Sequence, residues 1–119
     1  MVAGATLQIM KRFEVEKVVD ALENGITVFQ GVPQMFAVIV DYLAKTNRTL
    51  NAKNLKVISS GGAPLDPALK KDVEKIFGLN LNNGYGISET AAGVCTTDRK
   101  AHREDSSVGP ALELSLIHI

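Results

Sequence analysis

The sequence predicts an α/β fold, in which a mainly parallel sheet carries helices packed on its faces. Short apolar runs typical of buried strands alternate with segments whose apolar residues recur at helical spacing, over residues 6–82. Glycine and proline stand at the boundaries between these segments. This β-α-β order favours parallel strands joined by right-handed crossovers. A chain of 119 residues has the size of one small domain.

The first part of the chain predicts a strand, a helix and a second strand. Residues 6–10 are expected to form a short strand. The apolar residues that follow at positions i, i+3, i+4 and i+7 of one helical face are Val15, Val18, Val19 and Leu22. Asn24 and Gly25 favour the end of this helix, because both residue types tolerate the left-handed backbone. Residues 26–29 are apolar and β-branched, which is typical of a buried strand.

Two further helices follow the second strand. Residues 31–33 predict a turn, with Pro33 suited to the first turn of a helix. The apolar face of that helix is Phe36, Ile39, Val40 and Leu43. Residues 55–58 predict the next strand, and Asp66 before Pro67 is a strong helix start. The buried face expected for this third helix is Leu69, Val73, Ile76 and Phe77.

Residues 79–82 predict another short strand, which leads into a loop at Gly84-Tyr85-Gly86. Taken alone, Asn83-Gly84 between apolar residues is also a strong signal for a type I′ hairpin, so both structures are open at this point. Residues 91–96 are weakly strand-like, and residues 98–107 are expected to form a charged loop.

The composition excludes several classes of protein. Lysine and arginine total 13, aspartate and glutamate total 13, and no basic stripe suggests a nucleic-acid partner. No segment has the roughly 18 apolar residues that a membrane-spanning helix needs. The single cysteine, Cys95, rules out an internal disulfide and fits a reducing compartment, so we expect a cytoplasmic location. No spacing of histidine, cysteine and carboxylate suggests zinc, and His102 is expected at the surface.

Candidate chemistry lies in two glycine-containing segments that follow predicted strands. Ligands of open parallel sheets bind at the carboxyl ends of the strands. Gly61 and Gly62 leave no side chain in the way of a planar base, although a strand-to-helix turn also requires glycine. The ring of Tyr85 can stack on adenine, and the hydroxyl of Ser88 can bind phosphate. Glu89 can hold magnesium, which prefers oxygen ligands, or can belong to a polar helix start.

The stretches from Ser59 to Pro64 and from Asn82 to Thr90 together resemble the nucleotide-binding core of adenylate-forming enzymes, the acyl-CoA synthetase superfamily. The resemblance spans most of residues 2–113. It implies that residues 1–113 are an internal fragment of the large, layered, AMP-binding N-terminal domain of such an enzyme. Residues 114–119 match a translation of the transposase end sequence used as a sequencing adapter. We therefore expect a non-native tail there, with a genuine short strand as the alternative.

The resemblance also assigns roles to individual residues. Nucleotide binding falls on Gly61, Gly62, Ala63, Pro64, Tyr85, Gly86 and Ser88. Ser88 and Glu89 would act in catalysis, and Glu89 would bind the metal. Ser88 stands where threonine is commoner in the family, but it keeps the hydroxyl. The residues expected beside the acyl substrate are Gly31, Val32, Pro33 and Gly84.

The implied reaction joins a carboxylic acid to ATP, releasing pyrophosphate, and then transfers the acyl group from acyl-AMP to coenzyme A. Its implied cofactors and partners are ATP, Mg²⁺, coenzyme A as co-substrate and a small carboxylic acid. The sequence lacks the family's phosphate loop, its Thr-Gly-Asp ribose contact and the lysine of its mobile C-terminal domain, so the isolated chain is expected to be inactive. The alternatives are an adenylation domain that serves a carrier protein, and a non-catalytic nucleotide-binding or interaction module.

Overall fold

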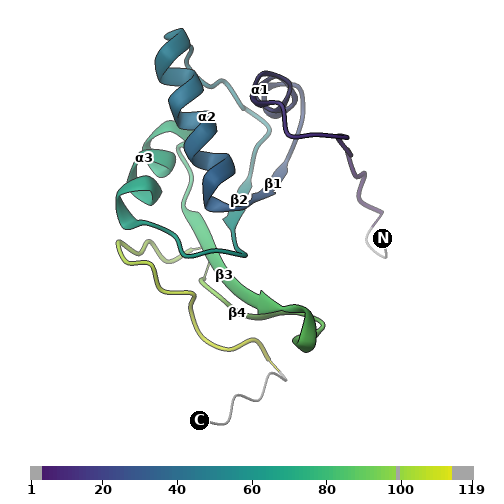
Figure 1. The fold of residues 1–119 in the computed structure, drawn as a ribbon, viewed down its shortest axis with the longest axis vertical. Coiled ribbons are helices and arrows are strands. Elements are labelled where there is room, and N and C mark those ends of the chain that lie inside the picture. The colour runs from purple at the N-terminus through teal and green to yellow at the C-terminus, as the bar shows by residue number, and fades with distance from the viewer. Residues whose placement is uncertain (1–3, 99, 114–119) are drawn as a thin grey trace.

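A computed structural model describes residues 4–98 and 100–113, so the expected tail at 114–119 lies outside the described residues. The described residues form one four-stranded sheet with the strand order β1-β2-β3-β4 (Figure 1). Its strands are β1 (Val28–Gly31), β2 (Val57–Ser60), β3 (Leu81–Ile87) and β4 (Ala92–Thr96). The first three run parallel, and β4 runs antiparallel to β3. The predicted mainly parallel α/β fold is therefore confirmed.

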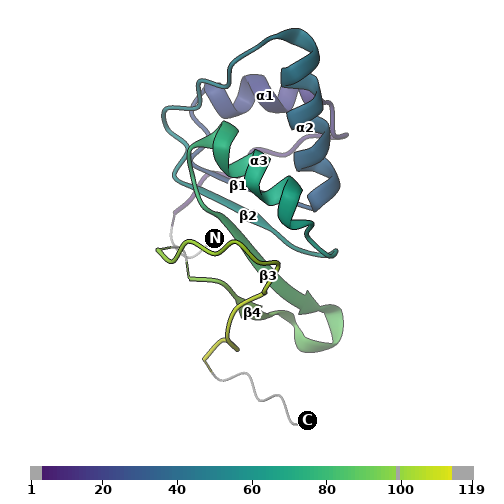
Figure 2. The same ribbon diagram turned by 90° about the vertical axis from the view of Figure 1, so that its left-hand side faces the viewer.

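The described helices are α1 (Val15–Glu23), α2 (Pro33–Thr46), α3 (Pro67–Phe77) and the 3₁₀ turn η1 (Ser88–Thr90). Figure 2 shows α1, α2 and α3 on one side of the sheet. Right-handed crossovers between strands that stay in sequential order place successive helices on the same face. In both views, β3 and β4 extend beyond this helical layer. Within the described part of the chain, no helix combines the length and apolar character needed to cross a membrane.

The hydrophobic core lies between the three α-helices and the sheet. Phe36 of α2 is fully buried at its centre, and its ring centroid lies 5.3 Å from that of Phe29 and 6.0 Å from that of Phe77. Both contacts are edge-to-face, the geometry that aromatic pairs favour. Other buried members are Val18, Val19, Leu22, Ile39, Leu43, Ile58, Val73 and Leu81. Most predicted apolar positions of α1 and α2 are thus confirmed, whereas Leu69, Ile76 and Phe77 of α3 are only half-buried.

The predicted starts of α2 and α3 are also confirmed. Pro33 opens α2, and Pro67 opens α3. The carboxylate of Asp66 accepts a hydrogen bond of 2.7 Å from the main-chain N–H of Ala68, which satisfies a donor that the helix itself cannot pair. Gly78 ends α3 at a φ of +66°, a conformation that glycine adopts at no steric cost.

Of the two strands predicted near the N-terminus, one is absent and the other is displaced by two residues. Residues 6–10 form no strand, and Leu7 and Ile9 are 67% and 81% exposed, because no described strand pairs with this segment. The second strand begins at Val28 instead of Ile26 and lies at the edge of the sheet. Val28 is therefore 54% exposed instead of buried.

The segment around Tyr85 also differs from the prediction. β3 continues through Asn83-Gly84 to Ile87, so neither a loop at residues 84–86 nor a hairpin at Asn83-Gly84 forms. The chain reverses later, at η1, and β4 then pairs with β3. A Cβ atom on Gly84 would lie 3.3 Å from the carbonyl oxygen of Cys95, and one on Gly86 would collide with the main chain of Ala92. These glycines therefore serve close packing of two strands instead of a turn.

A cluster of charged residues joins α1 to the segment after α2. The guanidinium of Arg48 donates hydrogen bonds of 2.7 Å to Asp20 and 2.6 Å to Glu23. The other carboxylate oxygen of Glu23 accepts from the main-chain N–H of Asn51 at 3.0 Å. The hydrogen bond from Arg48, followed by that from Asn51, lowers the pKa of Glu23 below its usual value of 4.5.

We expect this cluster to make folding stability depend on acid pH. Because the pKa of Glu23 is lowered on folding, its contribution is fully present above pH 4.5 and is lost as the pH falls through the lowered pKa. Urea denaturation at about pH 6 and about pH 3 should therefore show a smaller loss of stability in Glu23→Gln than in the wild type. Glu16→Gln removes an exposed carboxylate from the same helix, and this variant should lose as much stability as the wild type when the pH is lowered. Equal losses in all three proteins would contradict the assignment.

The pairing of β3 with β4 should not tolerate a side chain at Gly86. In Gly86→Ala the new Cβ would overlap the main chain of Ala92, so we expect the free energy of unfolding to fall by about 2 kcal/mol or more. Gly93→Ala is the matched control, because a Cβ there would touch only the side chain of Leu112, at 3.4 Å. Its stability should stay within about 0.5 kcal/mol of the wild type. Similar urea midpoints for the two variants would show that the strands separate without cost.

Candidate functional site

A cleft of about 1010 Å³ lies at the carboxyl ends of β1, β2 and β3. The candidate residues that line it come from the end of β1, the loop after β2, and the β3–η1 segment: Gly31, Val32, Gly61, Gly62, Gly84, Tyr85, Gly86 and Ser88. Parallel pairing brings these segments together, since Gly31 lies beside Ser60 and Ser60 lies beside Asn83 in the sheet register. Most of the predicted site residues thus line one cleft at the sheet edge where parallel α/β proteins bind ligands.

Glycine determines the shape of the cleft floor. A Cβ atom on Gly61 would lie 3.3 Å from the carbonyl oxygen of Gly84, so the end of β2 packs against β3 backbone to backbone. Gly62 has a φ of +79°, which L side chains rarely adopt. The main chain of residues 61–62 is consequently open to the cleft, as a planar ligand would require.

Tyr85 forms part of the cleft wall. It lies on β3 opposite Cys95 of β4, and 49% of the residue is exposed. A half-exposed ring on a rigid strand offers a stacking surface without the need to order a loop. Ile87 on the same strand is 41% exposed and contributes apolar surface.

The turn at η1 holds Ser88 beside the cleft. The hydroxyl of Thr90 donates a hydrogen bond of 2.9 Å to the carbonyl oxygen of Ile87 and accepts one of 3.4 Å from the N–H of Ile87. Ala91 then takes the left-handed conformation, with a φ of 53°. The turn leaves both Ser88 and Glu89 exposed.

Four of the predicted site residues are absent from the described lining of the cleft: Pro33, Ala63, Pro64 and Glu89. Pro33 is buried at the start of α2, and Ala63 and Pro64 are exposed between β2 and α3. Among the described residues, no group of three histidine, cysteine or carboxylate side chains is arranged to hold a metal ion. One exposed carboxylate, that of Glu89, fits only a magnesium ion that takes its other ligands from substrate phosphates and water.

The cleft also contains residues that sequence reasoning did not select. Ser60 is 4% exposed, and its hydroxyl has no hydrogen-bond partner within residues 4–98 and 100–113. A serine at the end of a buried parallel strand is the signal that could have identified it. Gln30 and Met35 add a polar and an apolar side chain. Among the described lining residues, none carries a charged side chain.

Cys95 and His102 occupy different places in the structure. Cys95 is half-buried on β4 and lines the cleft. His102 is a surface residue, as predicted, with 57% of its side chain exposed, and its Nδ1 lies 3.7 Å from a carboxylate oxygen of Glu74.

Comparison with known proteins shows relatives of similar sequence and similar fold. The chain is 36% identical over 114 residues to 4-coumarate–CoA ligase-like 6 of Arabidopsis thaliana, covering 89% of this chain and 19% of that protein. It is 32% identical over 91 residues to a long-chain-fatty-acid–CoA ligase of Thermus thermophilus, covering 76% and 16% of the two chains. The chain thus spans about a fifth of the length of these curated relatives.

Solved structures show the same fold. The crystal structure of ATP-bound MatB from Rhodopseudomonas palustris matches with a TM-score of 0.77 at 23% identity, over 88% of this chain and 20% of that chain. A long-chain-fatty-acid-CoA ligase from Archaeoglobus fulgidus matches with a TM-score of 0.74 at 26% identity, over 83% and 22% of the two chains. The family described as AMP-binding enzyme matches residues 1–119, and the chain therefore belongs to the AMP-binding enzyme family, as its resemblance to adenylate-forming enzymes predicted.

Proposed function

We propose that residues 1–113 are part of the AMP-binding N-terminal domain of an acid–CoA ligase. The complete enzyme would activate a carboxylic acid with ATP to acyl-AMP and pyrophosphate, and would then transfer the acyl group to coenzyme A. The observation that carries this proposal is the meeting of both glycine-containing segments at one cleft on the carboxyl edge of the sheet. The relatives named above are ligases, which favours an enzyme over a non-catalytic module.

In this proposal the chain binds and orients the nucleotide. The ring of Tyr85 stacks on the adenine, while the glycine backbone at residues 61–62 lets the base approach closely. Ala63 and Pro64 continue the adenine-facing loop, and the main chain of Gly86 lies beside the ring. Because binding in a fixed orientation removes much of the entropy cost of the reaction, positioning of this kind is itself catalytic.

Ser88 and Glu89 act on the phosphates. The hydroxyl of Ser88 donates a hydrogen bond to a phosphate oxygen, and the carboxylate of Glu89 takes part in holding magnesium. When bound, magnesium neutralises charge that develops on the phosphates as pyrophosphate leaves. Both side chains are exposed in η1, directly after β3, and Ser88 also lines the cleft, which supports these roles.

The acyl group would lie against Gly31, Val32 and Gly84, at the end of β1 and in the middle of β3, with Pro33 buried behind them at the start of α2. The described lining of the cleft carries no charged side chain, whereas Val32, Met35, Ile87 and Leu112 give it apolar surface. A carboxylate or ammonium in the acyl group would lose its hydration there without gaining a partner. We therefore propose a fatty or aromatic acid as substrate.

A cytoplasmic location stays a prediction, which rests on the single cysteine of the chain, Cys95.

The isolated 119-residue chain should have no ligase activity. Groups that stabilise the charge of the transition state usually contribute most of the rate enhancement, and the sequence lacks the family's phosphate loop and catalytic lysine. Pyrophosphate release would be measured with ATP, magnesium and a panel of fatty and aromatic acids. Acid-dependent turnover by the isolated chain would overturn this expectation.

In the full-length protein that contains this chain, Glu89→Gln should slow adenylation about a hundredfold, equivalent to about 3 kcal/mol in the transition state. The amide keeps the size of the side chain but loses the charge that holds magnesium.

Tyr85→Ala should instead raise the KM for ATP, because it removes the stacking surface. The measurement is acid-dependent ATP–pyrophosphate exchange at several magnesium concentrations, together with the melting temperature. Wild-type exchange by Glu89→Gln at low magnesium would remove Glu89 from the metal site.

A further inference from the structure

Lys70 of α3 is a buried lysine outside the cleft lining. Only 3% of the residue is exposed, although lysine is among the residue types least often buried. Its ammonium donates hydrogen bonds to the main-chain carbonyl oxygens of Arg103 and Asp105, the latter at 3.4 Å. A buried charge is costly unless it is hydrogen-bonded, so these two carbonyl groups account for the burial of Lys70. Both belong to residues 100–107, which we call the return segment.

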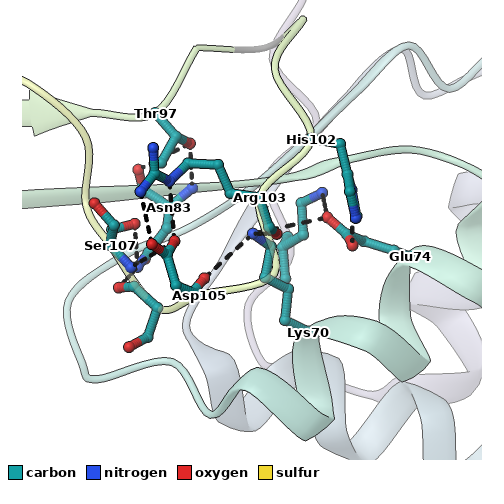
Figure 3. A network of polar contacts seen from close by, with 10 residues as sticks. Lys70, Glu74, Asn83, Thr97, His102, Arg103, Asp105 and Ser107 are labelled. Carbon is teal, nitrogen blue, oxygen red and sulfur yellow. Dashed lines mark hydrogen bonds and ion pairs between the residues drawn. The ribbon is translucent and has the colours of Figure 1, made fainter.

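The next turn of α3 carries a second attachment. One carboxylate oxygen of Glu74 accepts a hydrogen bond of 2.8 Å from the N–H of Leu81, the first residue of β3, and lies 4.0 Å from the ammonium of Lys70. The other oxygen faces His102 of the return segment, 3.7 Å away. Figure 3 shows Lys70 and Glu74 on one face of α3, both directed at the return segment. This face of α3 therefore contacts both the start of β3 and the return segment.

The return segment is braced internally beyond these contacts. The guanidinium of Arg103 donates two hydrogen bonds, of 2.9 and 2.6 Å, to the carboxylate of Asp105. The same carboxylate accepts from the N–H of Ser107 at 3.3 Å. These contacts link the carbonyls held by Lys70 to the main chain at Ser107.

The far end of the return segment holds Asn83 of β3. The side-chain amide of Asn83 donates to the carbonyl oxygens of Ser106 at 2.9 Å and Ser107 at 3.3 Å. Its main chain exchanges hydrogen bonds of 2.9 Å with Thr97, whose hydroxyl accepts from the N–H of Asn83. Asn83 is 3% exposed and directly precedes Gly84 and Tyr85 on the same strand.

We propose that Lys70 is a positioning residue for the nucleotide site. It holds the return segment against α3. Through the carbonyls of Ser106 and Ser107 the return segment fixes Asn83, and this in turn fixes the position of Tyr85 relative to the cleft. The assignment rests on the proposed function of the cleft. It adds a residue that touches no part of the cleft but determines how tightly ATP binds.

The test compares Lys70→Met with Lys71→Met in the full-length protein that contains this chain. Methionine keeps the aliphatic stem of Lys70 and removes its donors, whereas Lys71 is an exposed lysine on the same helix and serves as the control. In acid-dependent ATP–pyrophosphate exchange, Lys70→Met should raise the KM for ATP about tenfold at nearly constant kcat per folded enzyme, the pattern of lost uniform binding. Lys71→Met should match the wild type. If kcat falls in proportion to the folded fraction while KM stays unchanged, Lys70 is only structural and the proposal fails.

A double-mutant cycle with Asn83→Ala tests the route. Both residues act on the return segment, so the increase in KM of the double variant should be clearly smaller than the product of the two single increases. If the increases in KM for ATP of the two single variants multiply in the double variant, the two residues act independently and the proposed route from Lys70 to Asn83 is wrong. If Lys70→Met does not fold, Lys70→Gln, which keeps one donor group, replaces it in the same comparison and should raise KM less.

Hydrogen exchange separates this proposal from the function on which it rests. In Lys70→Met, the amides of Asn83 and Thr97 should exchange faster than in the wild type, whereas amides in α2 should not change. A wild-type protein without ATP–pyrophosphate exchange activity would refute the proposed function. The comparison of amide hydrogen exchange would still decide whether Lys70 holds Asn83. Unchanged protection of both amides would overturn the positioning role.

Discussion

Close backbone packing of β3 against β2 on one side and β4 on the other is the constraint on which the cleft depends. Glycine makes this packing possible, because a Cβ on Gly61 would press on the carbonyl of Gly84 and one on Gly86 would overlap the main chain of Ala92. The same lack of side chains leaves the main chain bare at the cleft floor. A single steric requirement therefore brings the strands together and leaves room for a flat ligand.

The walls of the cleft contain an aromatic ring on a paired strand and a buried hydroxyl without a hydrogen-bond partner among the described residues. Tyr85 lies on a paired strand instead of a free loop, so little conformational entropy remains to be lost when a ligand stacks on it. The buried hydroxyl of Ser60 has no hydrogen-bond partner among the described residues, and leaving such a group unpaired typically costs about 1–3 kcal/mol. Rigidity at one wall and an unpaired hydroxyl at the other are features expected of a ligand site instead of a purely structural turn.

Support for this wall comes from outside the cleft. α3 has few fully buried apolar residues, and Lys70 is buried on it together with Val73. Polar contacts of Lys70 and Glu74 therefore help to hold α3 in the fold, whereas apolar contacts fill this role for α1 and α2. Directed hydrogen bonds fix the return segment at particular atoms, whereas apolar contacts would allow it to slide.

Local sequence was sufficient where a structure depends on nearby residues. The apolar spacing of α1 and α2 and the Asp66-Pro67 start of α3 were predicted, because helical periodicity and capping act within a few residues. The parallel order of the first three strands followed from the alternation of strands and helices. From that order, both glycine-containing segments were correctly expected at the same edge of the sheet.

Tertiary structure decided what depends on partners distant in the sequence. Asn83-Gly84 has the local signature of a hairpin, yet it is extended because β2 and β4 pair with it on both sides. Residues 6–10 have the pattern of a strand but lack a described strand to pair with. The burial of Lys70 arises from carbonyl groups more than 30 residues away, which no local pattern reveals. The sequence by itself thus determined the helices, the fold class and most of the residues that line the cleft, whereas the pairing of β3 and the support behind Tyr85 were decided by contacts that only the folded chain creates.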